Sequence, residues 1–437
     1  MRQSARSGLW SSGWVLAVAV LALFAPRPAV AAEITRLASS FEPDDPFGMY
    51  LTAGYVRDQR KGKLVREWHQ DGDVREVSEL RWLQVEHRLD LDLRIGLWTD
   101  LEFRYTLPIV FSRDQTWDYA RPAGQETGPE NSTLTNNCLR ADGTLYDPSC
   151  PTTNAGAQPV FGVPSASYRG GLGDMRFGLA YALFNERKDP SKPNWILGVD
   201  YEAPTATLND PTQETSPSAR GGIGDRHHKY TFYTALSKRR GVADPYFRVH
   251  YTLPVRGPGW YSNCDHPSAE NMQAPDNCGE GFWTRSRTGT SAPHTGGVTF
   301  GSEFVPWEQG PHQRVAIDLR LLANYVGPAR YYNPLSDVLG KTLYTSDHLE
   351  LGGAAGLTAW AADFLGFSLL GTLTYTTEHT LTGEEVGEDL SGDGVVRLDN
   401  RAELNPNYDH RVDVTSRRLR AHEMFHWRVD AKATFNF

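Results

Sequence analysis

Apolar and polar side chains alternate along "LQVEHRLDLDLRI", residues 83–95. Leu, Val and Ile fill one set of alternate positions, interrupted only by His87, and charged residues or Gln fill the other. This alternation predicts a β-strand with one apolar face and one polar face. After the turn "GLWTD" (96–100), a second alternating segment runs from Leu101 to Ile109. The two segments predict a β-hairpin.

The same unit recurs along the chain and gives about twelve predicted strands, each near the ten residues of a membrane strand. They cover residues 49–55, 83–95, 101–109, 175–183, 195–203, 228–236, 247–255, 298–304, 315–325, 349–359, 365–375 and 425–437. Short turns alternate with long polar connections near residues 65, 140, 215, 275, 337 and 400. The pattern predicts an all-β fold over residues 49–437, a transmembrane antiparallel up-and-down β-barrel with short periplasmic turns and long extracellular loops.

Aromatic residues mark both ends of the predicted strands. Six tyrosines stand where a strand meets a long loop: Tyr55, Tyr105, Tyr201, Tyr251, Tyr325 and Tyr375. The opposite ends carry Trp98, Phe184, Trp195, Trp307, Phe364 and Phe437. Two such rings are typical of the two membrane–water interfaces. The alternating end "RVDAKATFNF" (428–437) is expected to pair with the first strand, because an open strand edge in lipid would leave backbone groups unpaired.

The first residues predict export. Arg2 and Arg6 precede an apolar run from Trp14 to Ala25 and small residues before Ala32. This is the pattern of a secretory signal peptide over residues 1–31. Residues 32–48 are then a short N-terminal periplasmic or lumen segment. The predicted location is the bacterial outer membrane, with membrane lipid and lipopolysaccharide as partners and with the assembly machinery recognising the strand that ends at Phe437.

Composition alone does not distinguish this protein from a soluble exported one. The net charge is −9 and the mean hydropathy is −0.49. No basic stripe is present, so nucleic acid is not an expected partner. A secreted soluble β-sandwich is the alternative, but it predicts strands of five or six residues and no common register of tyrosines.

Several short motifs repeat. "GGLGD" (170–174) and "GGIGD" (221–225) each open a strand, and "YTLP" closes strands at 105–108 and 251–254. With the hairpin "RLDLDLRIGLWTDLEFRYTLPIV" and the terminal Phe, these motifs resemble the exported β-barrel family labelled "MetA pathway of phenol degradation". The resemblance implies an outer-membrane barrel with a role in uptake of hydrophobic or aromatic compounds. Fatty-acid and aromatic-hydrocarbon channels carry a larger N-terminal plug than residues 32–48 provide.

The polar face of the strands is the candidate binding surface, facing the barrel lumen. It comprises Glu86, Arg88, Asp90, Asp92, Arg94, Glu102, Arg104, Arg248, Arg320, Arg428 and Asp430. These charges form either a narrow selective pore or an ion-pair network that fills the barrel. Small residues on this face leave a channel or make room for long arginines: Gly178, Ala180, Ala182, Gly352, Ala354 and Gly356. The glycines of the two "GxGD" junctions are expected to serve bulges or turns rather than a binding mouth.

Four cysteines and one acidic loop remain. Export favours disulfides, and of the three possible pairings the local one joins Cys138 to Cys150 and Cys264 to Cys278. In "DLSGDGVVRLDN" (389–400), Asp389, Ser391 and Asp393 occupy positions typical of calcium ligands, and a solvated acidic loop is the alternative. No other cofactor is expected.

These features predict a channel or uptake protein for small solutes, and the family resemblance implies hydrophobic or aromatic ones. The alternative is a surface-binding or structural barrel that acts through the loops 112–169 and 256–295. An outer-membrane lipase would need Ser and His close together on a strand. The one His-x-Ser pair, His266 and Ser268, lies in a loop, so an enzyme is not expected.

Overall fold

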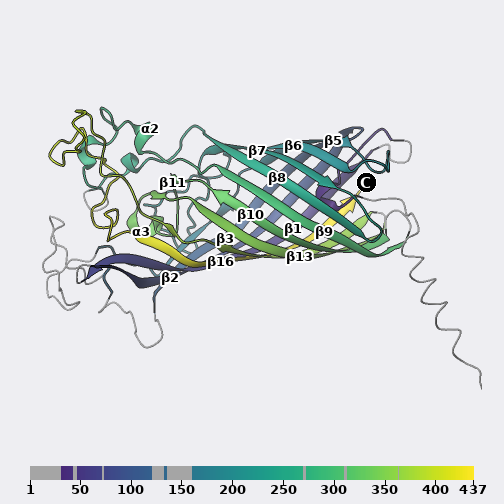
Figure 1. Cartoon of the computed structure of the whole chain (residues 1–437), viewed down its shortest axis with the longest axis horizontal. Helices are drawn as coiled ribbons and strands as arrows, with labels where there is room; N and C mark the ends of the chain where they lie inside the picture. Colours follow the sequence, from purple (N-terminus) through teal and green to yellow (C-terminus); the bar gives the residue numbers. More distant parts are fainter. Residues whose placement is uncertain are drawn as a thin grey trace, which may run out of the picture.

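The computed structural model describes residues 31–42, 47–70, 73–120, 132–134, 160–268, 272–309, 313–362 and 364–437 (Figure 1). Residues 1–30, which are all but the last residue of the predicted signal peptide, and the pair Cys138 and Cys150 lie outside these ranges. No helix in the described ranges is long and apolar enough to cross a membrane.

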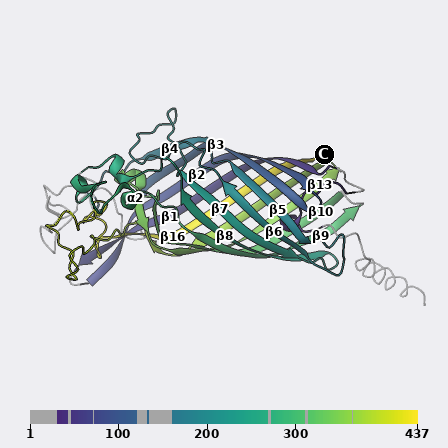
Figure 2. The same ribbon diagram turned by 90° about the horizontal axis from the view of Figure 1, so that it is seen from above.

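Twelve antiparallel strands form one closed barrel, as the sequence predicted (Figures 1 and 2). In barrel order they are β1 (Met49–Gln70), β2 (Asp73–Trp98), β3 (Leu101–Tyr119), β5 (Arg176–Phe184), β6 (Asn194–Glu202), β7 (His227–Ser237), β8 (Ala243–Arg256), β9 (Thr295–Gln309), β10 (Gln313–Val326), β13 (His348–Ala362), β14 (Leu365–Thr376) and β16 (Leu419–Asn436). Short strands β4 (Ala166–Leu172) and β15 (His379–Thr380) extend the wall along β3 and β16.

The last strand closes the barrel against the first. Strands β1 and β16 pair from Tyr50↔Asn436 up to Arg66↔Leu419, with one bulge. The Phe437 N–H donates to the Met49 carbonyl at 3.0 Å. The alternating C-terminus therefore ends in a continuous hydrogen-bonded wall rather than in solvent.

The two faces of the wall differ as the alternation predicted. Large apolar side chains are exposed on the outside, among them Leu51, Leu179, Phe232, Leu321 and Leu369. Charged side chains of the wall are buried inside, for example Glu86 and Asp90 on β2 and Glu102 on β3. An apolar outer surface around a polar interior matches a lipid-facing barrel. The protein is an outer-membrane β-barrel.

Strands β1, β2 and β3 are longer than the sequence predicted. They contain 22, 26 and 19 residues, and they extend past the aromatic ring of tyrosines toward the long loops. The prediction ended the first strand at Tyr55 and the third at Ile109, and it began the second at residue 83. Beyond these points polar residues occupy both faces of the strands, so the alternation is lost. One of these polar residues, Arg66, contacts folded loops: it hydrogen-bonds the Thr133 and Arg411 carbonyls at 2.7 and 2.9 Å.

The extracellular mouth holds a second hydrophobic core. Leu64, Leu80, Trp82 and Trp117 from β1–β3 and Leu419 and Ala421 from β16 form this core with residues of the connections between barrel strands. These are Leu134, Val160, Phe161, Leu335, Val338, Leu339, Leu343, Leu381 and Val412. The connection near residue 337, expected to be a polar loop, folds as β11 (Ala329–Tyr331), α3 (Ser336–Leu339) and β12 (Leu343–Thr345). We call this loop assembly the cap. It also contains η2 (Asn263–Asp265), η3 (Pro275–Asn277), α2 (Arg285–Thr288) and the disulfide Cys264–Cys278.

Candidate functional site: the barrel interior

The upper half of the inner face is a chain of ion pairs. Arg88 lies between two carboxylates, with Nη1 2.8 Å from Glu86 and Nε 2.8 Å from Asp90. Arg113 from β3 reaches the second oxygen of Glu86 at 2.6 Å. Carboxylates and guanidinium groups thus compensate each other where water is scarce. Three of the predicted lumen residues, Glu86, Arg88 and Asp90, are therefore paired on the inner face.

The lower half is centred on Glu102, which is 0 % exposed. Its carboxylate pairs with Arg94 at 2.9 Å and with Arg104. It also accepts the backbone N–H of Ala38, which belongs to the N-terminal segment. One buried anion therefore holds two cations and part of the segment that enters the barrel from below.

The other predicted lumen residues behave differently from one another. Arg428 pairs with Asp430 at 2.8 Å, and Asp92 accepts the Thr106 hydroxyl at 2.6 Å. Arg320 pairs with Asp318, a residue that the prediction did not include. Arg248 lies 4.5 Å from the ring centroid of Tyr233, and no described carboxylate lies within ion-pair distance of it. The structure brings all eleven residues to the inner face; their role in binding stays a prediction.

A chamber of about 500 Å³ lies in the middle of the barrel. Its charged lining includes Asp92, Arg94, Arg104, Asp200, Arg248 and Lys432. The facing strands β13 and β14 contribute small uncharged residues, Gly356, Thr358, Gly366 and Ser368. The charged residues therefore share the chamber with uncharged ones from β13 and β14, which also include Trp360.

Small residues on the inner face either adjoin a large side chain of the next strand or line the chamber. A Cβ on Gly178 would overlap the Asp200 carboxylate, and one on Gly198 would overlap the Tyr233 ring. Gly178 and Gly198 thus make room for larger side chains of the adjacent strand. Gly356 lines the chamber. The side chains that a Cβ on Gly178 or Gly198 would overlap are thus an aspartate and a tyrosine, not the long arginines of the prediction.

Residues 32–42 close the periplasmic end from inside. Helix η1 (Glu33–Thr35) lies against β6 and β7, and Leu37 packs on a cluster of Ala180, Ala182, Ile196, Tyr233 and Ala235. The Thr35 hydroxyl hydrogen-bonds Ser237 at 2.8 Å, and the Glu33 N–H donates to Glu303 at 3.0 Å. Glu33 and Ile34 form part of the chamber lining. The segment is short, yet it forms the floor of the chamber.

The two "GxGD" junctions meet around an upper cavity of about 310 Å³, which is lined by Gly173, Asp174, Gly224, Asp225 and Pro108 among others. Asp174 accepts the Ala206 N–H at 2.8 Å, and the Gly224 N–H donates to Thr207 at 2.7 Å. A Cβ on Gly222 would overlap the Leu208 carbonyl. The glycines permit close backbone packing, as predicted, and they also line a cavity, which was not predicted. Arg176 lines both this cavity and the chamber.

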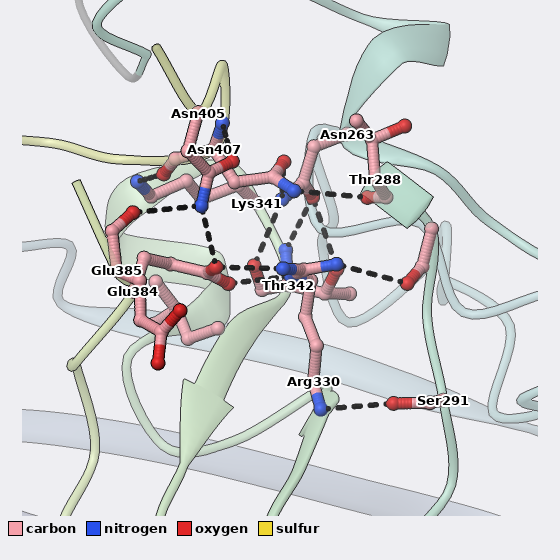
Figure 3. A network of polar contacts seen from close by, with 12 residues as sticks. Asn263, Thr288, Ser291, Arg330, Lys341, Thr342, Glu384, Glu385, Asn405 and Asn407 are labelled. Atoms are coloured by element: carbon pink, nitrogen blue, oxygen red, sulfur yellow. Dashed lines mark hydrogen bonds and ion pairs between the residues drawn. The ribbon is translucent and has the colours of Figure 1, made fainter. Parts of the chain in front are cut away.

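A buried polar network joins three loops of the cap (Figure 3). Lys341 is fully buried, and its Nζ donates to the Asn407 carbonyl at 2.9 Å. Asn263 donates to the Thr342 carbonyl at 3.0 Å and to the Asn407 side chain at 2.9 Å. Arg330 forms a bidentate pair with Glu384, at 2.6 Å through Nη2. Buried polar groups with satisfied partners specify a unique packing, so these loops form one folded unit.

Burial shifts the titration of two carboxyl groups in the cap. Burial raises the pKa of Asp413 to about 7, against the opposing effect of the Lys341 charge. For Glu384 burial also acts to raise the pKa, but the charge of Arg330 outweighs it and the pKa lies below its usual value. The pKa of Asp413 therefore lies above the ordinary carboxyl value, and the pKa of Glu384 lies below it.

The remaining predicted sites lie in the cap. Asp389 accepts the N–H groups of Gly392 and Gly394 at 2.7 and 2.6 Å, and Asp393 pairs with Arg397 at 2.5 Å. No group of three or more potential ligands is placed to hold a metal ion in the described ranges, and calcium binding stays a prediction. His266 lies 3.4 Å from Asp210.

Sequence reasoning missed several inner residues. Asp200, Tyr233, Asp318 and Lys432 lie on the inner face of predicted strands, so alternation alone could have identified them. The cap network had no such signal, because its residues come from loops without periodicity.

No protein-family model and no curated protein matches the sequence. Solved structures do. An outer-membrane channel from Pseudomonas putida F1 is 11% identical, with 91% of this chain and 100% of that chain covered and a TM-score of 0.42. A FadL homologue from Pseudomonas aeruginosa is 9% identical over 89% of this chain and 90% of that one, with a TM-score of 0.32. The TodX monoaromatic hydrocarbon channel (deltaS2 mutant) is 11% identical over 91% of each chain, with a TM-score of 0.31.

Two of these similar structures are described as channels. The barrel assignment rests on the chain's own closed sheet and apolar exterior.

Proposed function

We propose that the protein is an outer-membrane channel for small solutes, held closed at its periplasmic end by residues 32–42. The observation that carries this proposal is the central chamber, whose floor is a segment that is not part of the wall. A barrel that served only as a structural anchor would gain nothing from a polar chamber of this size. Release of the segment would join the chamber to the periplasm.

The lining supports small polar or amphipathic solutes. Arginine and aspartate side chains face the chamber beside Thr358, Ser368 and the ring of Trp360. The hydrophobic or aromatic solutes implied by the sequence resemblance are a narrower proposal. Uptake of toluene and of a sugar of similar size into liposomes would distinguish the two classes.

A second candidate, a surface-binding barrel, is favoured by one observation. The cap has its own hydrophobic core and buried polar network, as a folded recognition surface would. Under this proposal, replacement of the cap loops abolishes ligand binding, and neither the original nor the altered barrel conducts ions. Under the channel proposal, a barrel with shortened loops still passes solute.

Single-channel recording tests the closed-floor proposal. The Leu37→Asp variant places a charge against Ala180, Ile196 and Ala235, and it should expel the segment. We expect the mature wild-type protein to show rare, small openings in a planar bilayer, and L37D to raise the mean conductance at least fivefold. Phe41→Ser is the matched control, since Phe41 belongs to the same segment but is 65% exposed and outside that cluster.

A wild-type conductance that L37D leaves unchanged would contradict the proposed floor. Liposomes that stay tight to all small solutes with both proteins would contradict the channel itself. Enzymatic activity is not part of the proposal.

A further inference from the structure

The outer surface carries cations just above the ring of tyrosines. On β1, Leu51, Ala53 and Tyr55 face outward, and Arg57 and Lys61 continue this exposed row toward the extracellular side. Strand residues rise about 3.3 Å each, so Arg57 lies roughly 7 Å beyond Tyr55 along the strand. Interfacial tyrosines mark the level of lipid headgroups. Arg57 therefore lies at the depth where the phosphates of the outer leaflet are found.

A histidine stands beside this arginine, held by the tyrosine. The register pairs Arg57 directly with His87 on β2, so both side chains lie on the same outer face. His87 Nδ1 is 2.6 Å from the Tyr55 hydroxyl, and the two rings are stacked. The tyrosine fixes the imidazole and occupies Nδ1, leaving Nε2 as the second hydrogen-bonding nitrogen.

Arg57 is positioned but not neutralised. Its guanidinium carbon lies 5.2 Å from the ring centroid of Trp427 on β16. Within the described ranges, no carboxylate lies within 4.0 Å of Arg57 or of Lys61. The nearby outward acids already have partners: Glu423 pairs with Lys63 at 2.6 Å, and Asp114 pairs with Arg220. The site thus presents an uncompensated positive charge with a fixed geometry.

We propose that Arg57, His87 and Trp427 form a binding site for a phosphate group of the outer-leaflet glycolipid. A guanidinium group binds phosphate through two parallel hydrogen bonds, and an adjacent imidazole adds a third donor when protonated. The Trp427 ring orients the guanidinium group and packs beside the acyl chains. Lys61 offers a second cation farther outward on the same row.

Two other Tyr–His pairs resemble the Tyr55–His87 pair but lack an adjacent arginine. Tyr201 and His228 are 2.7 Å apart, and Tyr251 and His294 are 2.8 Å apart, both with stacked rings. The cross-strand neighbour of His228 on β8 is Val255, not an arginine, and His294 precedes β9. These pairs fit a general interfacial role, whereas the Arg57 pair adds the charge that a phosphate requires.

Native mass spectrometry of the mature protein in detergent micelles tests the site. We expect wild-type protein to retain bisphosphorylated lipid A, and Arg57→Gln to weaken that binding at least tenfold. Arg57→Lys should keep part of it. The matched control is Lys192→Gln, because Lys192 lies 5.1 Å from the Phe184 ring centroid at the opposite, periplasmic end. Its loss should leave lipid A binding unchanged.

A second measurement uses only the wild-type protein, so it does not depend on the folding of any variant. Dephosphorylated lipid A should bind at least tenfold more weakly than the bisphosphorylated form. Equal binding of the two lipids would show that acyl chains alone are recognised and would overturn the proposal. Equal binding by wild type and R57Q would overturn it as well. Either result leaves the channel proposal untouched, because conductance does not depend on this outer site.

Discussion

At the scale of single residues, the interior depends on shared charges. Glu102 is the clearest case, since one fully buried carboxylate serves Arg94, Arg104 and the N–H of Ala38. Breaking a buried pair by neutralising one partner costs about 3–5 kcal/mol, because the other charge stays buried. Alternation predicted that these side chains face inward. It could not predict which carboxylate would hold two cations, because that depends on side-chain geometry across strands.

Glu102→Gln is therefore expected to lower the free energy of unfolding by about 3–5 kcal/mol and to loosen the N-terminal segment. Urea titration of the folded barrel in micelles measures the first effect, and bilayer conductance measures the second. Asp200→Asn is the matched control, since Asp200 also lines the chamber but has no ion-pair partner within 4.0 Å among the described residues. An equal decrease in the free energy of unfolding of the two variants would show that the ion pairs of Glu102 do not contribute more than the Asp200 carboxylate does.

At the scale of elements, the strands followed from the sequence and the cap did not. Period-two alternation located all twelve barrel strands because one face of each must meet lipid. Beyond the apolar band of the membrane, β1 and β2 carry Arg57, Lys61 and Arg81 on outward positions, so the alternation disappears while the strands continue. Leu335, Val338, Leu339 and Leu343 are apolar but lie in a loop with no regular period, and their inward packing is a tertiary effect.

The cap should respond to pH through Asp413. Its pKa is about 7 in the folded cap, above the ordinary value, because of burial. Between about pH 4 and pH 7 the folded cap holds a proton that the unfolded loop has released, so this group stabilises the cap in acid, and the stabilisation is lost as pH rises through 7. The effect is on the order of 4 kcal/mol at most. Glu384, with a lowered pKa, contributes stability that is lost only in stronger acid.

Hydrogen exchange of residues 381–418, corrected for intrinsic rates at each pH, measures this dependence. We expect protection to fall between about pH 4 and pH 7 and to level off above pH 7 in the wild type, and to be nearly flat in Asp413→Asn. Asp393→Asn, an exposed change in the same loop, should keep the wild-type slope. A variant D413N whose protection falls as steeply as that of the wild type would assign the pH dependence to another group.

At the scale of the whole molecule, the polar and apolar surfaces are exchanged relative to a soluble protein. Polar groups fill the interior, and aliphatic and aromatic groups cover the exterior, which is why a net charge of −9 and a mean hydropathy of −0.49 did not reveal a membrane protein. The chamber lies between a folded cap above and residues 32–42 below. The sequence predicted the cylinder, but it left open whether the cylinder was closed inside, because short segments without alternation decide that.

Closure of the wall is the condition on which all other features depend, and the last three residues test it. Deleting residues 435–437 removes the pairs of Phe435 with Leu51 and Leu365 and the hydrogen bond from Phe437 to Met49. The freed backbone groups would face lipid, where each unpaired group costs several kcal/mol. We expect less than a tenth of the truncated protein to reach the compact form that migrates faster on unheated gels. Phe437→Ala keeps the backbone bond and should fold to at least half the wild-type yield, so equal yields of the truncated and full-length proteins would mean that β1 and β16 need not pair to this end.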